Sequence, residues 1–219
     1  MRTFSVIIVL FCAGCVEAAD AISSRDAKID NVQLHYLTAG KEQPAVILLH
    51  GFAETSRMWR PIMPTLAEKF TVIAPDLPGI GDSSIPTDNK IDIITAAKQI
   101  HDLVHSLKIE KARVVGHDIG LKADRRAYTE AYSKPGRMRA AWTYFVSWPQ
   151  LAKDFAQLSQ TKLTMPVLSI GGEKSLGNKL GAQMKLVADN VTVIVLPNTG
   201  HWILEEKPKE TTNALVNFL

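Results

Sequence analysis

Cysteine is nearly absent from this chain, which has only Cys12 and Cys15. Beyond residue 15 neither a disulfide nor thiol chemistry is available. The excess of positive over negative charge is also small. A net charge of +3 is too low to indicate a nucleic-acid partner. No apolar run is long enough for a stable membrane span, and there are no internal repeats. What remains is 219 residues with 46% hydrophobic content, which suits one globular domain.

The N-terminus has the pattern of a targeting segment. Arg2 precedes an apolar run over residues 6–16, and small residues follow at positions 18 and 19. This pattern predicts a signal peptide over residues 1–19 and a secreted or periplasmic protein. A lipoprotein signal with Cys15 as the lipidated residue is an alternative, and a buried N-terminal strand or helix is a third.

Strands and helices alternate along the rest of the chain. Apolar segments with the composition of strands lie at residues 30–37, 45–49, 71–74, 112–115, 163–170 and 191–196. Helical spacing of apolar residues is found at 59–70, 91–107, 123–158 (broken near Pro135-Gly136), 180–187 and 210–219. The inner strands are uniformly apolar, as in strands buried on both faces. The pattern predicts an α/β fold with a mostly parallel sheet flanked by helices.

Five polar residues follow directly after predicted strands. In parallel sheets, ligands bind beyond the carboxyl ends of the strands, so these residues are candidates for one site. They are His50, Asp76, Asp118, Glu173 and His201.

The segment Val114-Val115-Gly116-His117-Asp118-Ile119-Gly120 reads as a strand, a tight turn and the start of a helix. Glycines two residues before and two after Asp118 allow a sharp, crowded turn. The segment resembles a nucleophile elbow with aspartate at its centre. A strand followed by an Asp-capped helix is the alternative interpretation.

Four motifs occur in the order found in α/β-hydrolases. They are His50-Gly51-Phe52, the Asp76-Leu77-Pro78-Gly79-Ile80-Gly81-Asp82-Ser83 segment, Gly116-His117-Asp118-Ile119-Gly120 and Gly200-His201-Trp202. Together they resemble the epoxide hydrolase and haloalkane dehalogenase branch. The resemblance implies an α/β-hydrolase core in two parts, residues 20–121 and 161–219, separated by a remnant helical lid at 122–160.

The chemistry of the central aspartate can be argued from its charge. A carboxylate is ionised at pH 7, so Asp118 can attack an electrophilic carbon without a base and form an alkyl ester. His201 would activate the water that hydrolyses this ester. The resemblance assigns the oxyanion hole to the backbone N–H groups of Phe52 and Ile119, and it implies neither a metal nor a cofactor. It gives His50 a role in shaping the oxyanion loop, and we expect His117 to pack behind the elbow.

The residue after the nucleophile bears on the leaving group. Haloalkane dehalogenases commonly have Trp there and fluoroacetate dehalogenases Arg, whereas Ile119 resembles a bacterial epoxide hydrolase subgroup. We therefore expect a small, apolar, electrophilic substrate. Tyr144, in the lid-like segment with Trp142, is a candidate acid for the alkoxide. It lies one residue before the family position, which Phe145 occupies here, so packing in the core or lid is the alternative.

The resemblance breaks directly after the elbow. In the family a full helix, another parallel strand and the first part of the lid follow, whereas here several dozen residues are missing. The missing strand often ends in the acid that orients the catalytic histidine. The other usual position of that acid aligns with Ser175. Glu173 is the nearest substitute, and an exposed loop acid is its alternative interpretation.

The missing segment has consequences for the fold and for the function. A buried sheet cannot leave backbone groups unpaired, so the strand at 163–170 is expected to close up against 112–115. A shortened lid would bare apolar surface and favour a homodimer or poor folding. A non-catalytic remnant that binds apolar ligands or self-associates therefore remains an alternative, as does a haloalkane or haloacid dehalogenase.

Overall fold

The computed structural model describes residues 22–42, 44–117 and 125–219. Its strands are β1 (Ser23–Ile29), β2 (Val32–Ala39), β3 (Ala45–Leu49), β4 (Thr71–Pro75), β5 (Ala112–Gly116), β6 (Val167–Gly172) and β7 (Val191–Leu196). Its helices are η1 (Ser56–Trp59), α1 (Met63–Ala67), α2 (Ile93–Ser106), α3 (Arg125–Ser133), α4 (Arg137–Val146), α5 (Trp148–Leu158), α6 (Asn178–Val187), α7 (Ile203–Glu206) and α8 (Pro208–Phe218). The predictions for the signal peptide, Cys15, Asp118 and Ile119 lie outside the described residues. Within the described ranges, no helix has the length and apolar character needed to cross a membrane.

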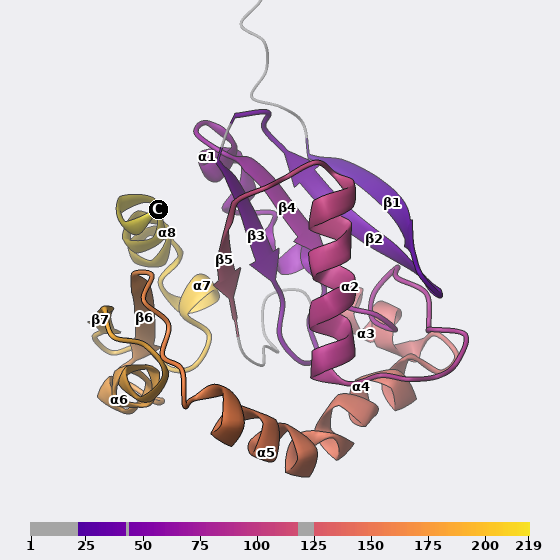
Figure 1. The fold of residues 1–219 in the computed structure, drawn as a ribbon. Helices are drawn as coiled ribbons and strands as arrows, with labels where there is room; N and C mark the ends of the chain where they lie inside the picture. Colours follow the sequence, from indigo (N-terminus) through magenta and orange to yellow (C-terminus); the bar gives the residue numbers. More distant parts are fainter. Residues whose placement is uncertain (1–21, 43, 118–124) are drawn as a thin grey trace, which may run out of the picture.

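A five-stranded sheet forms the larger part of the fold, with strand order β1-β2-β4-β3-β5 (Figure 1). β1 and β2 are antiparallel, and so are β2 and β4. β3 lies parallel to both β4 and β5, so the carboxyl ends of β3 and β5 lie side by side at the same end of the sheet. The loop of His50 and the segment that leads to Asp118 begin there.

The core lies on both faces of this sheet because alternate side chains of a strand point to opposite faces. In β3, Val46 and Leu48 pack in a cluster with side chains of η1, α1 and α8. Ala45 and Ile47 point the other way and pack with side chains of α2. All four are at most 2% exposed, which confirms that the apolar segment at 45–49 is a strand buried on both faces.

The expectation that the strand at 163–170 pairs with the strand at 112–115 is wrong. β6 pairs in parallel with β7, from Val167 opposite Val191 to Gly172 opposite Leu196, and these strands form a separate two-stranded sheet. Among the described strands, β5 pairs with β3 alone. The expectation assumed a buried slot, but most residues of β5 are exposed, and Val114 retains 65% of its accessible surface. Water can therefore form hydrogen bonds with the backbone N–H and C=O groups on the open edge of β5.

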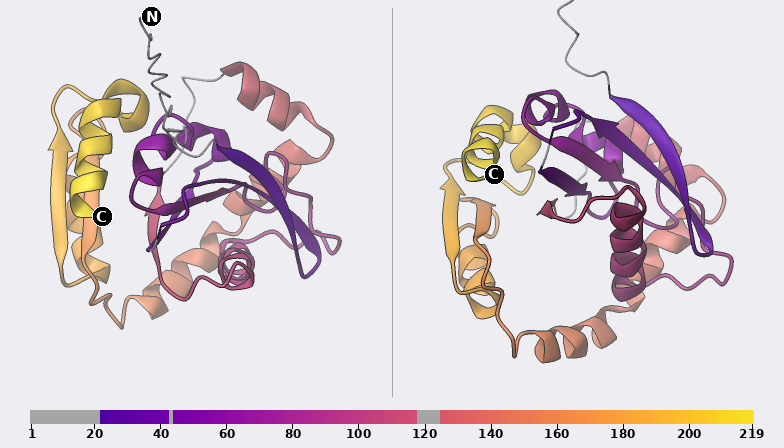
Figure 2. Two further views of the ribbon diagram at one scale, coloured as in Figure 1. Left: turned by 90° about the horizontal axis from the view of Figure 1, so that it is seen from above. Right: turned by 45° about the horizontal axis from the view of Figure 1, so that its top comes forward.

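The two sheets are linked by α3, α4 and α5, with α5 lying between α4 and β6 (Figure 2). The predicted break near Pro135-Gly136 is confirmed, since Gly136 has a φ of 78° at the start of α4. A second break at Ser147 separates α4 from α5. No residue of α5 is buried, and Trp148 and Phe155 are each 54% exposed. This surface is available for the homodimer expected from the sequence, which stays a prediction.

One expected helix differs from the structure, and one strand was not expected. Residues 59–70 include the end of the 3-10 turn η1, which begins at Ser56, and the five-residue helix α1 rather than one long helix. Pro61 and Pro64 lie in this stretch, and proline removes a backbone N–H that a continuous helix would use. β1 has no counterpart in the prediction because its residues are mainly polar and exposed.

Candidate active site

The loop after β3 is held by a buried histidine. His50 is 4% exposed, its Nδ1 donates to Gly51 O at 2.8 Å, and its Nε2 accepts from Leu77 N at 3.0 Å. Because a backbone N–H can only donate, the neutral ring must carry its proton on Nδ1. His50 therefore joins the predicted oxyanion loop to the loop after β4, in agreement with a shaping role.

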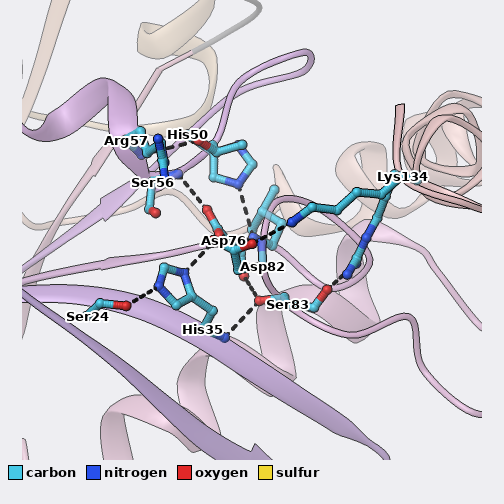
Figure 3. A network of polar contacts seen from close by, with 12 residues as sticks. Ser24, His35, His50, Ser56, Arg57, Asp76, Asp82, Ser83 and Lys134 are labelled. Atoms are coloured by element: carbon cyan, nitrogen blue, oxygen red, sulfur yellow. Dashed lines mark hydrogen bonds and ion pairs between the residues drawn. The ribbon is translucent and has the colours of Figure 1, made fainter. Parts of the chain in front are cut away.

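The loop after β4 is organised by Asp76, which is 1% exposed (Figure 3). Its Oδ1 accepts from Ser56 N at 2.6 Å, and its Oδ2 accepts from Asp82 N at 2.8 Å and from His35 Nδ1 at 2.9 Å. Burial alone would raise the pKa of Asp76, but the hydrogen bond from His35 and the amides of Asp82 and Ser56 hold it below its usual value. Asp76 is thus a charged structural hub.

The composition of this cluster also bears on metal binding. Ligand atoms of His35, Asp76 and Asp82 lie within 4.8 Å of one another. However, both Asp76 oxygens already accept hydrogen bonds, His35 Nε2 lies 2.8 Å from Ser24 Oγ, and Asp82 pairs with Lys134 Nζ at 2.6 Å. The donor atoms are occupied by protein partners, so the cluster serves as a structural network.

This network makes stability depend on pH. The hydrogen bond to Asp76 raises the pKa of His35 above 6.5 despite the opposing effect of burial, so its contribution is complete below pH 6.5 and is lost as pH rises through the folded-state pKa. The pKa of Asp76 lies below 3.8, so its contribution is complete above that value and is lost as pH falls through the folded-state pKa. Both contributions coincide between pH 3.8 and 6.5.

We expect urea unfolding midpoints to be highest in that window and to fall on raising the pH above 6.5. Replacing His35 with Asn should flatten the alkaline side of the profile, because the titrating partner of Asp76 is removed. His101→Asn is the matched control, since that ring is on the surface of α2 with 79% side-chain exposure. Wild-type protein and His35→Asn with parallel alkaline profiles would contradict this assignment.

A buried carboxylate that sequence reasoning missed lies beside the predicted elbow. Glu54 is 2% exposed, and its Oε2 accepts from Gly51 N at 2.9 Å and lies 3.3 Å from His117 Nδ1. Tyr132 Oη donates to Glu54 O at 3.1 Å. Glu54 therefore ties the oxyanion loop to the residue that immediately precedes Asp118. The His117 side chain is only 9% exposed, as expected for a residue that packs behind the elbow.

His201 lies in the loop between β7 and α7. Its ring centroid is 6.0 Å from that of His117 and 5.0 Å from that of Trp202. The structure thus brings the Gly200-His201-Trp202 motif beside the segment that leads into Asp118, although the main sheet and the β6–β7 sheet are separate. Asp118 and Ile119 themselves lie outside the described residues.

The predicted orienting acid has a different partner. Glu173 Oε2 accepts from Asn198 N at 2.8 Å, whereas His201 Nδ1 lies 3.3 Å from Ser175 Oγ. The structure therefore directs the Glu173 carboxylate to a backbone amide and brings Ser175 to the histidine. The role of Glu173 as an orienting acid stays a prediction, and Ser175 occupies the position that the family gives to that acid.

The candidate lid and oxyanion residues are packed together. The Phe52 ring makes edge contacts with Phe145, at a centroid distance of 4.5 Å, and with Tyr132 at 6.4 Å. Tyr144 is 8% exposed, donates to Pro78 O at 3.0 Å and has a pKa raised by burial. Trp142 is 61% exposed. The Tyr144 hydroxyl is directed at a backbone carbonyl, in agreement with the packing role given as its alternative. Its role as the acid for the alkoxide stays a prediction.

A pocket of about 450 Å³ opens next to these motifs. Its walls come from η1, the segment between η1 and α1, α3, α7 and the start of α8, together with Glu54 and His117. Met58, Ile62 and Trp202 supply apolar surface. The volume lies in the range typical of small-molecule sites.

Comparisons with known proteins agree with this geometry. A family model described as alpha/beta hydrolase fold matches residues 44–120. The soluble epoxide hydrolase of Corynebacterium sp. (strain C12) is 27% identical over 282 residues, covering 90% of this chain and 97% of that protein. The solved structure of epoxide hydrolase CorEH without ligand has a TM-score of 0.82 at 25% identity, covering 90% of this chain and 98% of that one. This chain therefore has the α/β-hydrolase fold, and the proteins it resembles over most of its length are epoxide hydrolases.

The α/β-hydrolase fold predicted from the sequence is therefore confirmed. A further solved structure, the Cif epoxide hydrolase from Acinetobacter nosocomialis, has the same fold, with a TM-score of 0.80 at 22% identity over 90% of this chain and 89% of that one. The alignment to the Corynebacterium enzyme spans 282 positions, more than the 219 residues of this chain. This α/β-hydrolase therefore lacks residues that its relative has, in agreement with the deletion inferred after the elbow.

Proposed function

We propose that this chain hydrolyses epoxides through an alkyl-enzyme ester. A carboxylate oxygen of Asp118 attacks an epoxide carbon, the ring carbon–oxygen bond breaks, and the alkoxide takes a proton from water. His201 then removes a proton from a second water as that oxygen attacks the ester carbonyl. The backbone N–H groups of Phe52 and Ile119 stabilise the oxyanion. Collapse of this intermediate releases a diol and restores the Asp118 carboxylate.

The observation that carries this proposal is the meeting of two motifs far apart in the chain. The ring of His117, the neighbour of Asp118, lies 6.0 Å from the ring of His201. His201 must lie near Asp118, because the water it activates attacks the carbonyl carbon of the Asp118 ester, and the segment that leads into Asp118 lies beside His201. The pocket beside them, with Met58, Ile62 and Trp202 in its walls, supports a small apolar substrate.

The contact of Ser175 with His201 also bears on the proposed mechanism. Ser175 Oγ lies 3.3 Å from His201 Nδ1 and can accept a hydrogen bond from the ring. Ile119, the residue after the proposed nucleophile, favours an epoxide over a halide as the substrate.

Turnover above the Asp118→Ala background tests the function. We expect purified wild-type protein to convert styrene oxide to its diol, measured by chromatography, and Asp118→Ala to give only the buffer rate because the nucleophile is gone. Halide release from a haloalkane would instead support a dehalogenase. Equal diol formation by both proteins, each folded by circular dichroism, would contradict the proposal.

A non-catalytic remnant is the second candidate, and the open edge of β5 favours it. Exposed side chains on that strand and on α4 and α5, among them Val114, Trp142 and Phe155, could be covered by a second copy of the chain. Sedimentation velocity at rising concentration tests this homodimer, and a monomer throughout would contradict it. Wild-type turnover above the Asp118→Ala background would exclude the remnant as a complete account.

A further inference from the structure

The loop that carries His201 is held by a carboxylate from the helix after it. Glu206, the last residue of α7, accepts from Gly200 N through Oε2 at 2.8 Å and from Trp202 N through Oε1 at 3.2 Å. These two amides flank His201 on either side. Hydrogen bonds to an ionised acceptor are roughly twice as strong as neutral ones.

This arrangement fixes the backbone on both sides of His201. Each carboxylate oxygen takes one N–H, so the Thr199–Gly200 and His201–Trp202 peptide planes are both tied to α7. A Cβ at Gly200 would lie 2.8 Å from Glu206 Oε1, so a side chain there would displace this carboxylate. The backbone on both sides of the His201 side chain is therefore held by Glu206.

We call the Glu206 carboxylate with the two amides it accepts from, Gly200 N and Trp202 N, the clamp. The clamp is itself anchored in the core. Glu206 N donates to Trp202 O at 2.8 Å, which closes the turn of α7. Thr211 Oγ1 of α8 donates to Ile203 O at 2.8 Å, and Thr211 is 1% exposed. Leu215 of the same helix belongs to the core cluster that packs against the main sheet. The position of His201 is thus linked to the sheet through α8 and α7.

We propose that Glu206 is the positioning residue for His201, acting through the backbone where the family uses an acid on the ring. This inference rests on the proposed function, because it assigns His201 the water-activating step. Ser175 Oγ contacts the ring itself, at 3.3 Å from Nδ1, whereas the Glu206 carboxylate holds the backbone on both sides of the histidine through the amides of Gly200 and Trp202.

Two substitutions of Glu206 and one control test the proposal. Glu206→Ala should lower kcat for the epoxide roughly 10- to 100-fold, because a small displacement of a catalytic group has effects of this size. KM should fall together with kcat, because hydrolysis of the ester becomes slower relative to its formation. The alkyl ester should accumulate on Asp118, since only its hydrolysis needs His201. Glu206→Gln, which keeps one acceptor oxygen, should recover part of kcat. Glu210→Ala, which removes an exposed acid 3.7 Å from Lys207 Nζ, should behave as wild type.

A second readout needs no substrate and separates this proposal from the proposed function. In Glu206→Ala the amides of Gly200 and Trp202 should exchange hydrogen faster and the ring resonances of His201 should shift, whereas Glu210→Ala should change neither. If wild-type protein turns over no epoxide while these changes occur, the clamp stands and the proposed reaction fails. Unchanged His201 resonances, or a folded Glu206→Ala variant with wild-type kcat, would overturn the proposal.

Discussion

Asp76→Asn is expected to lower the free energy of unfolding by about 3–5 kcal/mol, the usual cost of removing one partner of a buried ion pair. The Asp76 oxygens accept hydrogen bonds from Ser56 N, Asp82 N and His35 Nδ1. Asparagine has one acceptor oxygen, and its amide nitrogen would face a donor. At least one buried donor would then have no partner, and His35 would lose its negative charge.

The loss should be large because three segments meet at Asp76. His35 lies in β2, Ser56 begins η1, and Asp82 lies in the loop after β4 (Figure 3). Asp88→Asn is the matched control, since its carboxylate accepts from Lys90 N at the surface and its substitution should change stability by no more than about 0.5 kcal/mol. Urea unfolding at pH 5.5 measures both. A loss below about 1 kcal/mol for Asp76→Asn would contradict the role of this residue as a hub.

Strands buried on both faces were predictable because their composition alone identifies them. β3 and β4 are runs of apolar residues, and both lie inside the main sheet. β1 could not be found in this way, since its sequence Ser-Ser-Arg-Asp-Ala-Lys-Ile has little apolar content and its pairing with β2 supplies the order. The pattern of apolar residues reveals which segments are buried, and an exposed edge strand has few buried residues to produce such a pattern.

The separation of the two sheets could not be predicted from the sequence. The expectation that β6 would pair with β5 assumed that both strands are buried, whereas β5 lies at an exposed edge. Neither the apolar run at 112–115 nor that at 163–170 indicates its neighbour. Pairing partners depend on the path of the connecting chain, which here runs through three helices.

The residues of the candidate site likewise fall into those that could be predicted from the sequence and those that could not. The order of short motifs was enough to propose Asp118 and His201 as the reacting groups, because both residues lie within those motifs. Glu54, His35 and Glu206 were missed because each acts through a contact with a distant or backbone partner. One signal was present for Glu206. An acid in the first turn of a short helix can reach back to the backbone N–H groups that precede the helix, and Glu206 follows a loop histidine by five residues.

His201→Gln is expected to reduce turnover by up to about 10⁴-fold, comparable to the loss of a member of a catalytic triad. The attack of Asp118 on the epoxide does not need the histidine, whereas hydrolysis of the ester does. The substitution should therefore separate the two steps. Glutamine is similar in size to histidine and can hydrogen bond, so the variant is expected to fold. His101→Gln, which changes an exposed histidine of α2, is the matched control and should retain wild-type turnover.

The mass of the peptide that contains Asp118, after His201→Gln has been incubated with styrene oxide and digested, tests the central claim most directly. The account predicts a gain equal to the whole mass of the epoxide, because the ring opens without losing an atom. The gain should be absent from His101→Gln after turnover and from the double variant Asp118→Ala/His201→Gln. A folded His201→Gln protein whose Asp118 peptide keeps its original mass would contradict the ester mechanism.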